Sequence, residues 1–248
     1  MIVETWASHS VVDTSGNVVA VPNVAPLARG EFATQPRRVS DNTLVGNAPT
    51  INWADSNFGN QATWGFVQAN LNALVLKGNY FTADAVANPS WTVICTVRLN
   101  LVASGQHLWA WGTDDFTNET FVRMGRTGTG WYVAAHDGTS GLNTSPNYVA
   151  PISTFFVVAT SCASNGNITC RFNKVTRTSG IIAQSTCHPN TFTYGALWSG
   201  PYNDPTLGDQ GGLRLGFSGQ MGSLHAWNYD MSTTDMDYCA DELTSYFS

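Results

Sequence analysis

Acidic side chains are the first candidates for chemistry in this chain, because a pair of carboxylates can hydrolyse a glycosidic bond when the two groups lie about 5 Å apart in a retaining enzyme. One group of acids falls in a Thr- and Asn-rich turn, and a second surrounds a predicted helix start, where the helix dipole alone accounts for them. These acids are Asp114, Asp115 and Glu119 in the turn, and Asp235, Asp237, Asp241 and Glu242 near the helix. Neither group has the spacing of a carboxylate pair on one strand, so we expect a protein without enzymatic activity and name no catalytic residue.

Histidines and loop carboxylates give two other sites to consider. His136 precedes Asp137-Gly138 in a predicted turn, and no Gly-x-Ser-x-Gly motif is present, which argues against a nucleophile triad. His107 and His225 fall within predicted strands, where a half-buried imidazole is common. The loop from 198 to 212 carries Asp204 and Asp209, which are too few oxygen ligands for a calcium site by themselves. We therefore predict no cofactor and no metal ligand, with Ca²⁺ binding left as an open alternative.

Aromatic side chains remain as candidates for binding, since their rings can stack on the apolar faces of sugars while amide groups bond the hydroxyls. Trp198 and Tyr202, followed by Asn203, lie in a long loop, and Trp131 lies at the start of a predicted strand. We predict these four residues as the ligand-binding site because long loops carry function. The tryptophans of the strand 107–112 are interpreted as core residues.

The composition restricts the kind of partner. Charged residues make up 11% of the 248 residues and the net charge is -6, whereas about a quarter of an ordinary soluble domain is charged. With no basic cluster, nucleic acid is an unsuitable partner. No run approaches the roughly 18 apolar residues of a membrane span, and residues 1–10 do not resemble a signal peptide. We expect a protein made in the cytoplasm, with an uncharged polar surface that suits contact with proteins or neutral sugars.

Short strands separated by turns recur along most of the chain. The 23 glycines, 10 prolines and 12% aromatic content are typical of strands joined by tight turns. Strands are predicted at 71–76, 91–99, 107–112, 120–124, 130–135, 155–162, 168–174, 180–185, 192–197 and 213–217. No helical segment separates them, so the pattern predicts an all-β, two-sheet antiparallel jelly-roll sandwich.

The C-terminal end carries the clearest pattern. Residues 220–229 alternate between two faces, and both faces carry bulky side chains, which predicts a strand covered on both sides. One face would carry Met221, Ser223, His225, Trp227 and Tyr229. A short helix should follow. Its buried stripe would consist of Met236, Ala240, Leu243 and Phe247, and Ser232 with Asp235 would form its capping box.

The N-terminal 65 residues are different in character. After two short strands around the turn 13–17, the pattern dissolves into Pro, Gly, Asn and Asp with isolated aromatics. We predict an N-terminal arm at 1–65 and a jelly-roll domain at 66–248. The arm is either an ordered wrap over its own domain or an extension that finds its partners in an assembly.

The five cysteines have no metal-like spacing. If Asn165-Gly166 is a two-residue turn, Cys162 lies opposite Thr169 and Cys170 lies opposite Ser161, so that the two cysteines point to opposite faces. We therefore expect buried free thiols.

The order of these elements resembles a known family. The segments that carry the resemblance are Trp91-Thr92-Val93, Leu108-Trp109-Ala110-Trp111-Gly112, Trp131-Tyr132-Val133, Phe155-Phe156-Val157-Val158-Ala159, Leu213-Arg214-Leu215-Gly216, and the stretch from Phe217 to Leu224 that leads to Trp227-Asn228-Tyr229. Over residues 66–247 they are similar to the laminin-G-like branch of the concanavalin A-like lectin/glucanase superfamily. The resemblance implies two face-to-face sheets with the last helix lying against the sandwich.

This superfamily contains lectins, carbohydrate-binding modules, glycosidases and adhesion domains, including many in bacteriophage virion proteins. The resemblance therefore implies a non-enzymatic binding or structural module of a bacteriophage virion, on the capsid or tail surface. Its partners would be other virion proteins or copies of itself through the arm, and surface glycans, with no nucleic acid and no membrane. The alternatives are a free-standing lectin module and a glycosidase with an unrecognised site.

Overall fold

The structure is a computed structural model of the whole chain. It describes residues 1, 3–26, 32–34, 47–77, 90–101, 105–113, 120–127, 130–137, 141–143, 152–181, 191–195, 197–199, 212–214 and 216–248. All structural statements below concern these residues.

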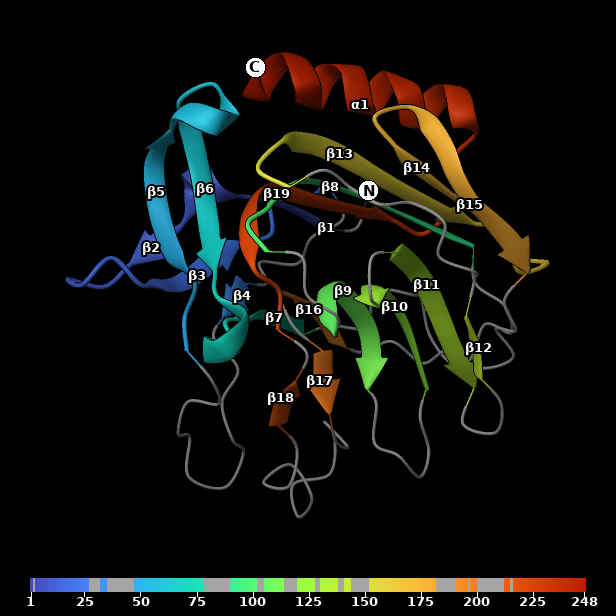
Figure 1. Ribbon diagram of the computed structural model, residues 1–248, viewed down its shortest axis with the longest axis horizontal. Coiled ribbons are helices and arrows are strands. Elements are labelled where there is room, and N and C mark those ends of the chain that lie inside the picture. The colour runs from blue at the N-terminus through green and yellow to red at the C-terminus, as the bar shows by residue number, and fades with distance from the viewer. Residues whose placement is uncertain are drawn as a thin grey trace.

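Two antiparallel sheets lie face to face, as the upper and lower layers of Figure 1 show. Within the described residues the first sheet consists of β1 (Val3–Trp6), β5 (Thr50–Asp55), β6 (Gln61–Phe66), β8 (Trp91–Leu99), β13 (Phe155–Cys162), β14 (Asn167–Phe172), β15 (Val175–Ile181) and β19 (Gly219–Trp227). Its order is β15-β14-β13-β8-β19-β6-β5, and β1 also pairs with β19.

The second sheet follows the order β12-β11-β10-β9-β16-β7-β4-β3-β2 over the part of the chain that is described. Its strands are β2 (Val11–Val12), β3 (Val18–Pro22), β4 (Phe32–Thr34), β7 (Leu74–Lys77), β9 (Gln106–Thr113), β10 (Thr120–Thr127), β11 (Gly130–Asp137), β12 (Gly141–Asn143) and β16 (Thr191–Tyr194). A separate pair is formed by β17 (Leu197–Ser199) and β18 (Gly212–Arg214), and short 3-10 turns occupy Ala7–His9, Ser56–Phe58 and Gln68–Asn70. The predicted two-sheet antiparallel sandwich is confirmed.

The main core fills the space between the sheets. Alternating strand positions from both sheets supply it, and its largest members are aromatic. Trp91 of β8 and Trp109 of β9 meet edge to face across the two layers, with ring centroids 5.6 Å apart. Such contacts fix how the sheets stack, and the interpretation of Trp109 as a core residue is confirmed.

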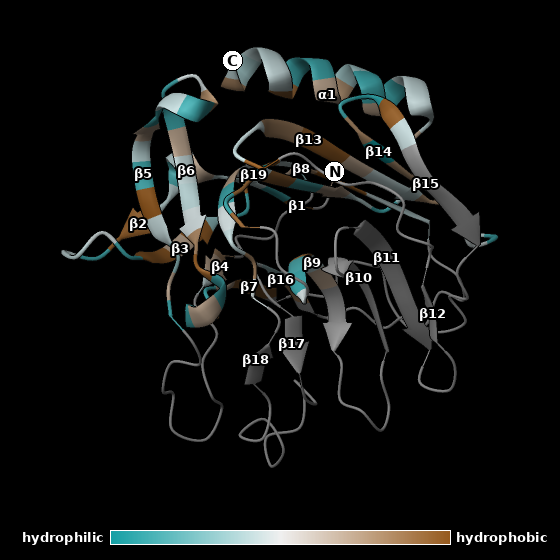
Figure 2. Cartoon of the chain, viewed as in Figure 1, coloured by the Kyte–Doolittle hydropathy of each residue, from teal (hydrophilic) through white to brown (hydrophobic). Residues whose placement is uncertain are grey.

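The C-terminal helix α1 (Thr233–Phe247) covers the outer face of the first sheet (Figure 1). Its buried residues are Met236, Ala240, Leu243 and Phe247, and the Ser232 hydroxyl accepts a hydrogen bond from the Asp235 N–H at 3.2 Å. The predicted buried stripe and the cap at Ser232 are confirmed. The Asp235 carboxylate accepts a hydrogen bond from the Ser232 hydroxyl at 2.7 Å and none from the Ser232 backbone N–H in the described structure, so only the Ser232 half of the predicted capping box forms. Figure 2 shows mostly hydrophobic colour on β13 and β8 beneath α1 and hydrophilic colour along much of the helix, as expected of an amphipathic covering helix.

Strand β19 is buried on both faces, as predicted, but its side chains are distributed differently from the prediction. Its register against β8 shifts between Met221 and Ser223, which leaves Gly222 as an extra residue in a β-bulge. Met221 therefore joins Leu224 in the core between the sheets, while Trp227 packs into the second core cluster beneath α1. The prediction that placed Met221 on the face of Ser223, His225 and Trp227 is wrong.

The hairpin of β13 and β14 also differs from the prediction. Ala163 and Asn167 close a turn with three residues between them, and Gly166 adopts a φ of 82°. The additional turn residue shifts the register by one, so Cys162 pairs with Ile168, and Cys170 with Thr160. The two cysteines consequently lie on the same face, contrary to the prediction.

The thiols themselves are as expected. Cys95 and Cys170 are buried free thiols, and Cys239 is a half-buried free thiol. Cys162 is also buried, and its Sγ–H donates a hydrogen bond to the Ala163 carbonyl at 3.6 Å. Cys187 lies outside the described residues.

The described parts of the N-terminal segment contribute strands to both sheets. From it, β1 pairs with β19 and β6 pairs with β5 and β19 in the first sheet, whereas β3 and β4 extend the second. These strands correspond to the ordered-wrap alternative. The domain boundary at residue 65 stays a prediction. No helix among the described residues is long and apolar enough to cross a membrane.

Candidate functional site

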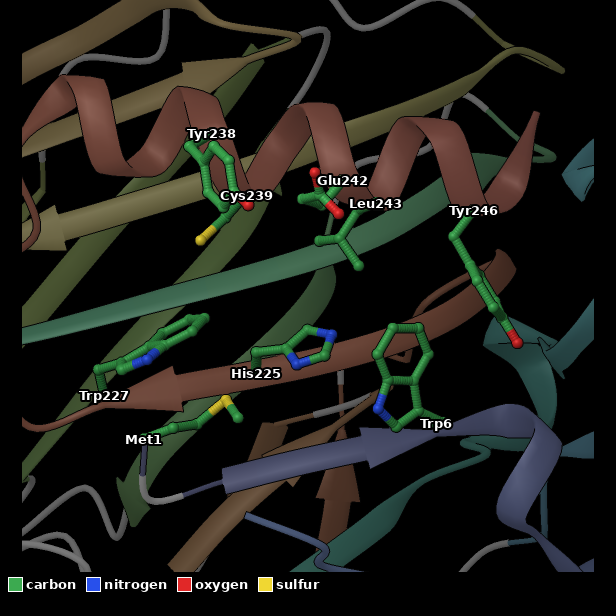
Figure 3. Close-up of a pocket in the computed structure, with 9 residues that line it drawn as sticks. All are labelled: Met1, Trp6, His225, Trp227, Tyr238, Cys239, Glu242, Leu243 and Tyr246. Carbon is green, nitrogen blue, oxygen red and sulfur yellow. The ribbon is translucent and has the colours of Figure 1, made fainter. Parts of the chain in front are cut away.

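An open pocket of about 330 Å³ lies between α1 and the outer face of the first sheet (Figure 3). We call it the helix-side pocket. The strands contribute Trp6, His225 and Trp227, and the helix contributes Tyr238, Cys239, Glu242, Leu243 and Tyr246, with Met1 at one side. Most of this lining is apolar and aromatic.

The strand side of the pocket follows from the pairing of β1 with β19. Trp6 lies opposite Ser223 and Glu4 lies opposite His225. Because alternate residues of a strand share a face, Trp6, His225 and Trp227 all point towards α1. Strands β1 and β19 are more than 200 positions apart in the sequence and become neighbours only in the folded sheet.

The helix side follows from helical spacing. Tyr238, Glu242 and Tyr246 are separated by four residues and form one stripe. This stripe flanks the buried stripe of α1, so it lies at the edge where the helix meets the sheet. Tyr238 is 66% exposed and Tyr246 is 42% exposed, which leaves much of each phenol ring available to a ligand.

The indole of Trp6 is held in place by three contacts. Its Nε1–H donates a hydrogen bond to Glu4 Oε1 at 2.9 Å. Its ring meets the Tyr246 ring at a centroid distance of 5.1 Å and the Phe247 ring at 6.1 Å. These contacts hold one wall of the pocket in position before a ligand arrives, which lowers the entropy cost of binding.

His225 lies between the two indoles (Figure 3). Its ring meets Trp6 edge to face at 4.9 Å and stacks on Trp227 at 6.1 Å. The residue is 5% exposed, and its Nε2 atom has no hydrogen-bond partner among the described residues. Burial lowers the pKa of His225 to about 4, so the imidazole is neutral at pH 7 and offers one N–H donor and one acceptor nitrogen.

The remaining titratable groups have limited chemical capacity. The Glu242 carboxylate is exposed at the rim. Burial, reinforced by nearby Asp235, raises the pKa of Cys239, so its thiol is protonated and weakly nucleophilic near neutral pH. No cluster of His, Cys, Asp and Glu suited to a metal ion occurs in the described part of the chain. The arrangement can bind a ligand through ring faces, one imidazole and one rim carboxylate.

The residues predicted as the binding site lie elsewhere or are not described. The backbone of Trp131 is in β11, opposite Arg126, and that of Trp198 is in β17, opposite Leu213. The side chains of both lie outside the described residues, as do Tyr202 and Asn203 entirely. The predicted site therefore stays a prediction, separate from the helix-side pocket.

Sequence reasoning missed Trp6, Tyr238 and Tyr246, and it assigned His225 and Trp227 to packing alone. The four-residue spacing of Tyr238 and Tyr246 beside the buried stripe of α1 was the available signal. The partner strand β1 had no such signal, because its pairing with β19 is long-range.

No protein-family model matches this chain, and no curated protein matches it. Solved structures do. Domain 4 of AbnA, a GH43 extracellular arabinanase from Geobacillus stearothermophilus in complex with arabinotriose, aligns over 96% of this chain and 97% of its own, with a TM-score of 0.60 and 12% identity. The binding domain of botulinum neurotoxin serotype G aligns over 97% of this chain and 50% of its own, with a TM-score of 0.62 and 10% identity.

The fold is shared. A third neighbour, the binding domain of botulinum neurotoxin DC in complex with SialylT, has a TM-score of 0.58 and 11% identity, with 92% of this chain and 51% of that chain aligned. The present chain thus spans about half of these neurotoxin chains. At such identities the likeness shows the β-sandwich fold alone, and a bacteriophage source stays a prediction.

Proposed function

We propose that this chain is a non-enzymatic glycan-binding module and that the helix-side pocket is its binding site. The observation that carries the proposal is the set of aromatic walls around one buried imidazole. Trp6 and Trp227 present indole rings from the sheet, and Tyr238 presents a phenol from the helix. Pyranose rings have apolar C–H faces that pack on the electron-rich faces of such rings.

The structural neighbours are in keeping with this proposal. One of them holds arabinotriose, another is in complex with SialylT, and both share the sandwich of this chain. Because one fold hosts many functions, the pocket itself has to supply the argument for binding.

The non-enzymatic part of the proposal rests on the carboxylates. Hydrolysis of a glycosidic bond requires an acid and a second carboxylate on opposite sides of the bond. Among the described residues that line the pocket, Glu242 is the carboxylate, and nearby Glu4 is bonded to the Trp6 indole. The alternative of a glycosidase is tested by incubating the full chain with a panel of polysaccharides, and release of reducing sugar would contradict our proposal.

A glycan array probed with the full chain tests binding. Trp227→Ala and Tyr238→Ala should each reduce binding to the retained glycans at least tenfold, because each removes one ring face. The matched control is Trp53→Ala, since Trp53 is 52% exposed on β5 and does not line the pocket. Equal binding by the two pocket variants and the control would refute the site, and no retained glycan would refute the function.

We extend the proposal to a setting on a bacteriophage virion, with the free-standing lectin as its alternative. The family resemblance supports this extension. The incorporation of β3 and β4 into the second sheet weighs against it, because each of these strands pairs with its own chain on both sides. Mass spectrometry of purified particles would test it, and absence of the chain from particles would favour the lectin.

A further inference from the structure

The shape and polarity of the helix-side pocket restrict its ligand further. A volume of about 330 Å³ is at the lower end of small-molecule sites, which suits one sugar residue better than an extended chain. The lining is so apolar that a sugar with hydroxyls on every side would lose hydrogen bonds on entering it. A suitable ligand presents an apolar group with a single polar group beside it.

His225 supplies the matching polar group at the floor of the pocket. Its buried Nε2 has no partner among the described residues, and a buried polar atom without a partner is costly. The indoles of Trp6 and Trp227 flank it at 4.9 and 6.1 Å, so an apolar group placed beside the imidazole would contact aromatic carbon.

The charges around the pocket favour an uncharged ligand. The imidazole is neutral at pH 7, and Glu242 provides a negative charge at the rim. The net charge of the chain is also negative, at -6. A sugar that carries a carboxylate would be repelled by this field.

We infer that the helix-side pocket accepts the acetamido group of a neutral N-acetylated amino sugar and that His225 is its specificity-determining residue. The methyl group packs between the indoles and Leu243, and the amide N–H donates a hydrogen bond to the imidazole. This inference rests on the proposed function, since it names the class of glycan that the same site binds.

The test compares matched monosaccharides on the full chain. Methyl N-acetyl-β-glucosaminide, methyl β-glucoside, methyl β-glucosaminide and N-acetylneuraminic acid are titrated separately, and the indole N–H signals of Trp6 and Trp227 are followed by NMR. Burial of one methyl group with one added hydrogen bond should make the N-acetylated glycoside bind at least tenfold more tightly than the glucoside. N-acetylneuraminic acid should bind more weakly than the neutral N-acetylated sugar.

Variants at His225 separate the hydrogen bond from the apolar contact. His225→Phe keeps a ring of similar size without an acceptor, so the affinity for the N-acetylated glycoside should fall several-fold more than the affinity for the glucoside. His225→Gln restores a polar group and should recover part of the preference. The comparison between sugars uses the unaltered chain, so it holds even if a variant fails to fold.

Two results would overturn the inference and leave the proposed function in place. One is equal affinity for the N-acetylated glycoside and the glucoside with shifts of both indole signals. The other is tighter binding of the glucosaminide or of N-acetylneuraminic acid, which would assign recognition to charge. If no sugar moves either indole signal and no glycan is retained on the array, the proposed function fails as well.

Discussion

His225 should make the stability of this protein depend on pH in a defined direction. Burial lowers its pKa to about 4 in the folded chain, whereas an exposed histidine has a pKa of about 6.5. Since the unfolded chain binds the proton more readily, the stabilising contribution is complete above pH 6.5 and declines as the pH falls towards 4. Between pH 7 and pH 4.5 this single group should cost about 2 kcal/mol of the free energy of unfolding.

Other titratable groups lie around His225, so the measurement has to be a difference. Glu4 faces His225 from β1, and Glu242 and Cys239 face it from α1. These groups remain in His225→Phe, in which the imidazole alone is lost. Urea denaturation gives the free energy of unfolding at pH 7.0 and at pH 4.5 for each protein. The decrease between the two pH values should be about 2 kcal/mol smaller in His225→Phe than in the unaltered chain.

The reasoning would be refuted by the same pH dependence in both proteins. It would also be refuted by an NMR titration in which the His225 ring protonates near pH 6.5 in the folded chain. Either result would mean that the imidazole is hydrated or partnered in solution and that the floor of the helix-side pocket is polar.

Three further predictions concern the bulge of β19, the start of α1 and the buried thiols. In Gly222→Ala the added Cβ would lie 2.5 Å from a ring carbon of Phe247, so the free energy of unfolding measured by urea denaturation should fall by about 1–3 kcal/mol. An unchanged free energy of unfolding would show that the bulge adjusts freely. Ser232→Ala removes the N-cap of α1 and should cost about 1 kcal/mol by the same assay; retained stability would show that the cap is dispensable. Burial raises the pKa of Cys170 to about 12, so an alkylating reagent should modify half-buried Cys239 first and Cys170 only when the chain unfolds. Peptide mass spectrometry measures the order of modification, and the reverse order would contradict the burial of Cys170.

The elements that were predicted correctly from the sequence are those that follow from local periodicity. The helix and its buried stripe follow from a spacing of three to four residues between Met236 and Phe247, which is visible without any knowledge of the rest of the fold. The strands of the sandwich follow from alternation and turn residues in the same way. Neither prediction required a long-range contact.

The errors arose where one residue changes the register. The bulge at Gly222 and the three-residue turn before Asn167 each add one residue, and an addition of this kind moves side chains to the other face of the sheet. The alternation of β19 remains readable on either side of the bulge. For this reason the sequence predicted the strand correctly and the face of Met221 incorrectly.

The helix-side pocket was beyond local reasoning because it depends on β1. Trp6 reaches the pocket only because β1 pairs with β19, and its indole is then fixed by Glu4 on the same strand. β1 pairs with β19 along one side, and on its other side the Glu4 carbonyl accepts a hydrogen bond from the Val24 N–H at 3.0 Å, so the strand is bonded to its own chain on both sides. Contacts with neighbouring copies through the N-terminal segment would therefore have to use residues outside β1, and loss of β1 should abolish binding at this pocket whether or not the protein belongs to a larger assembly.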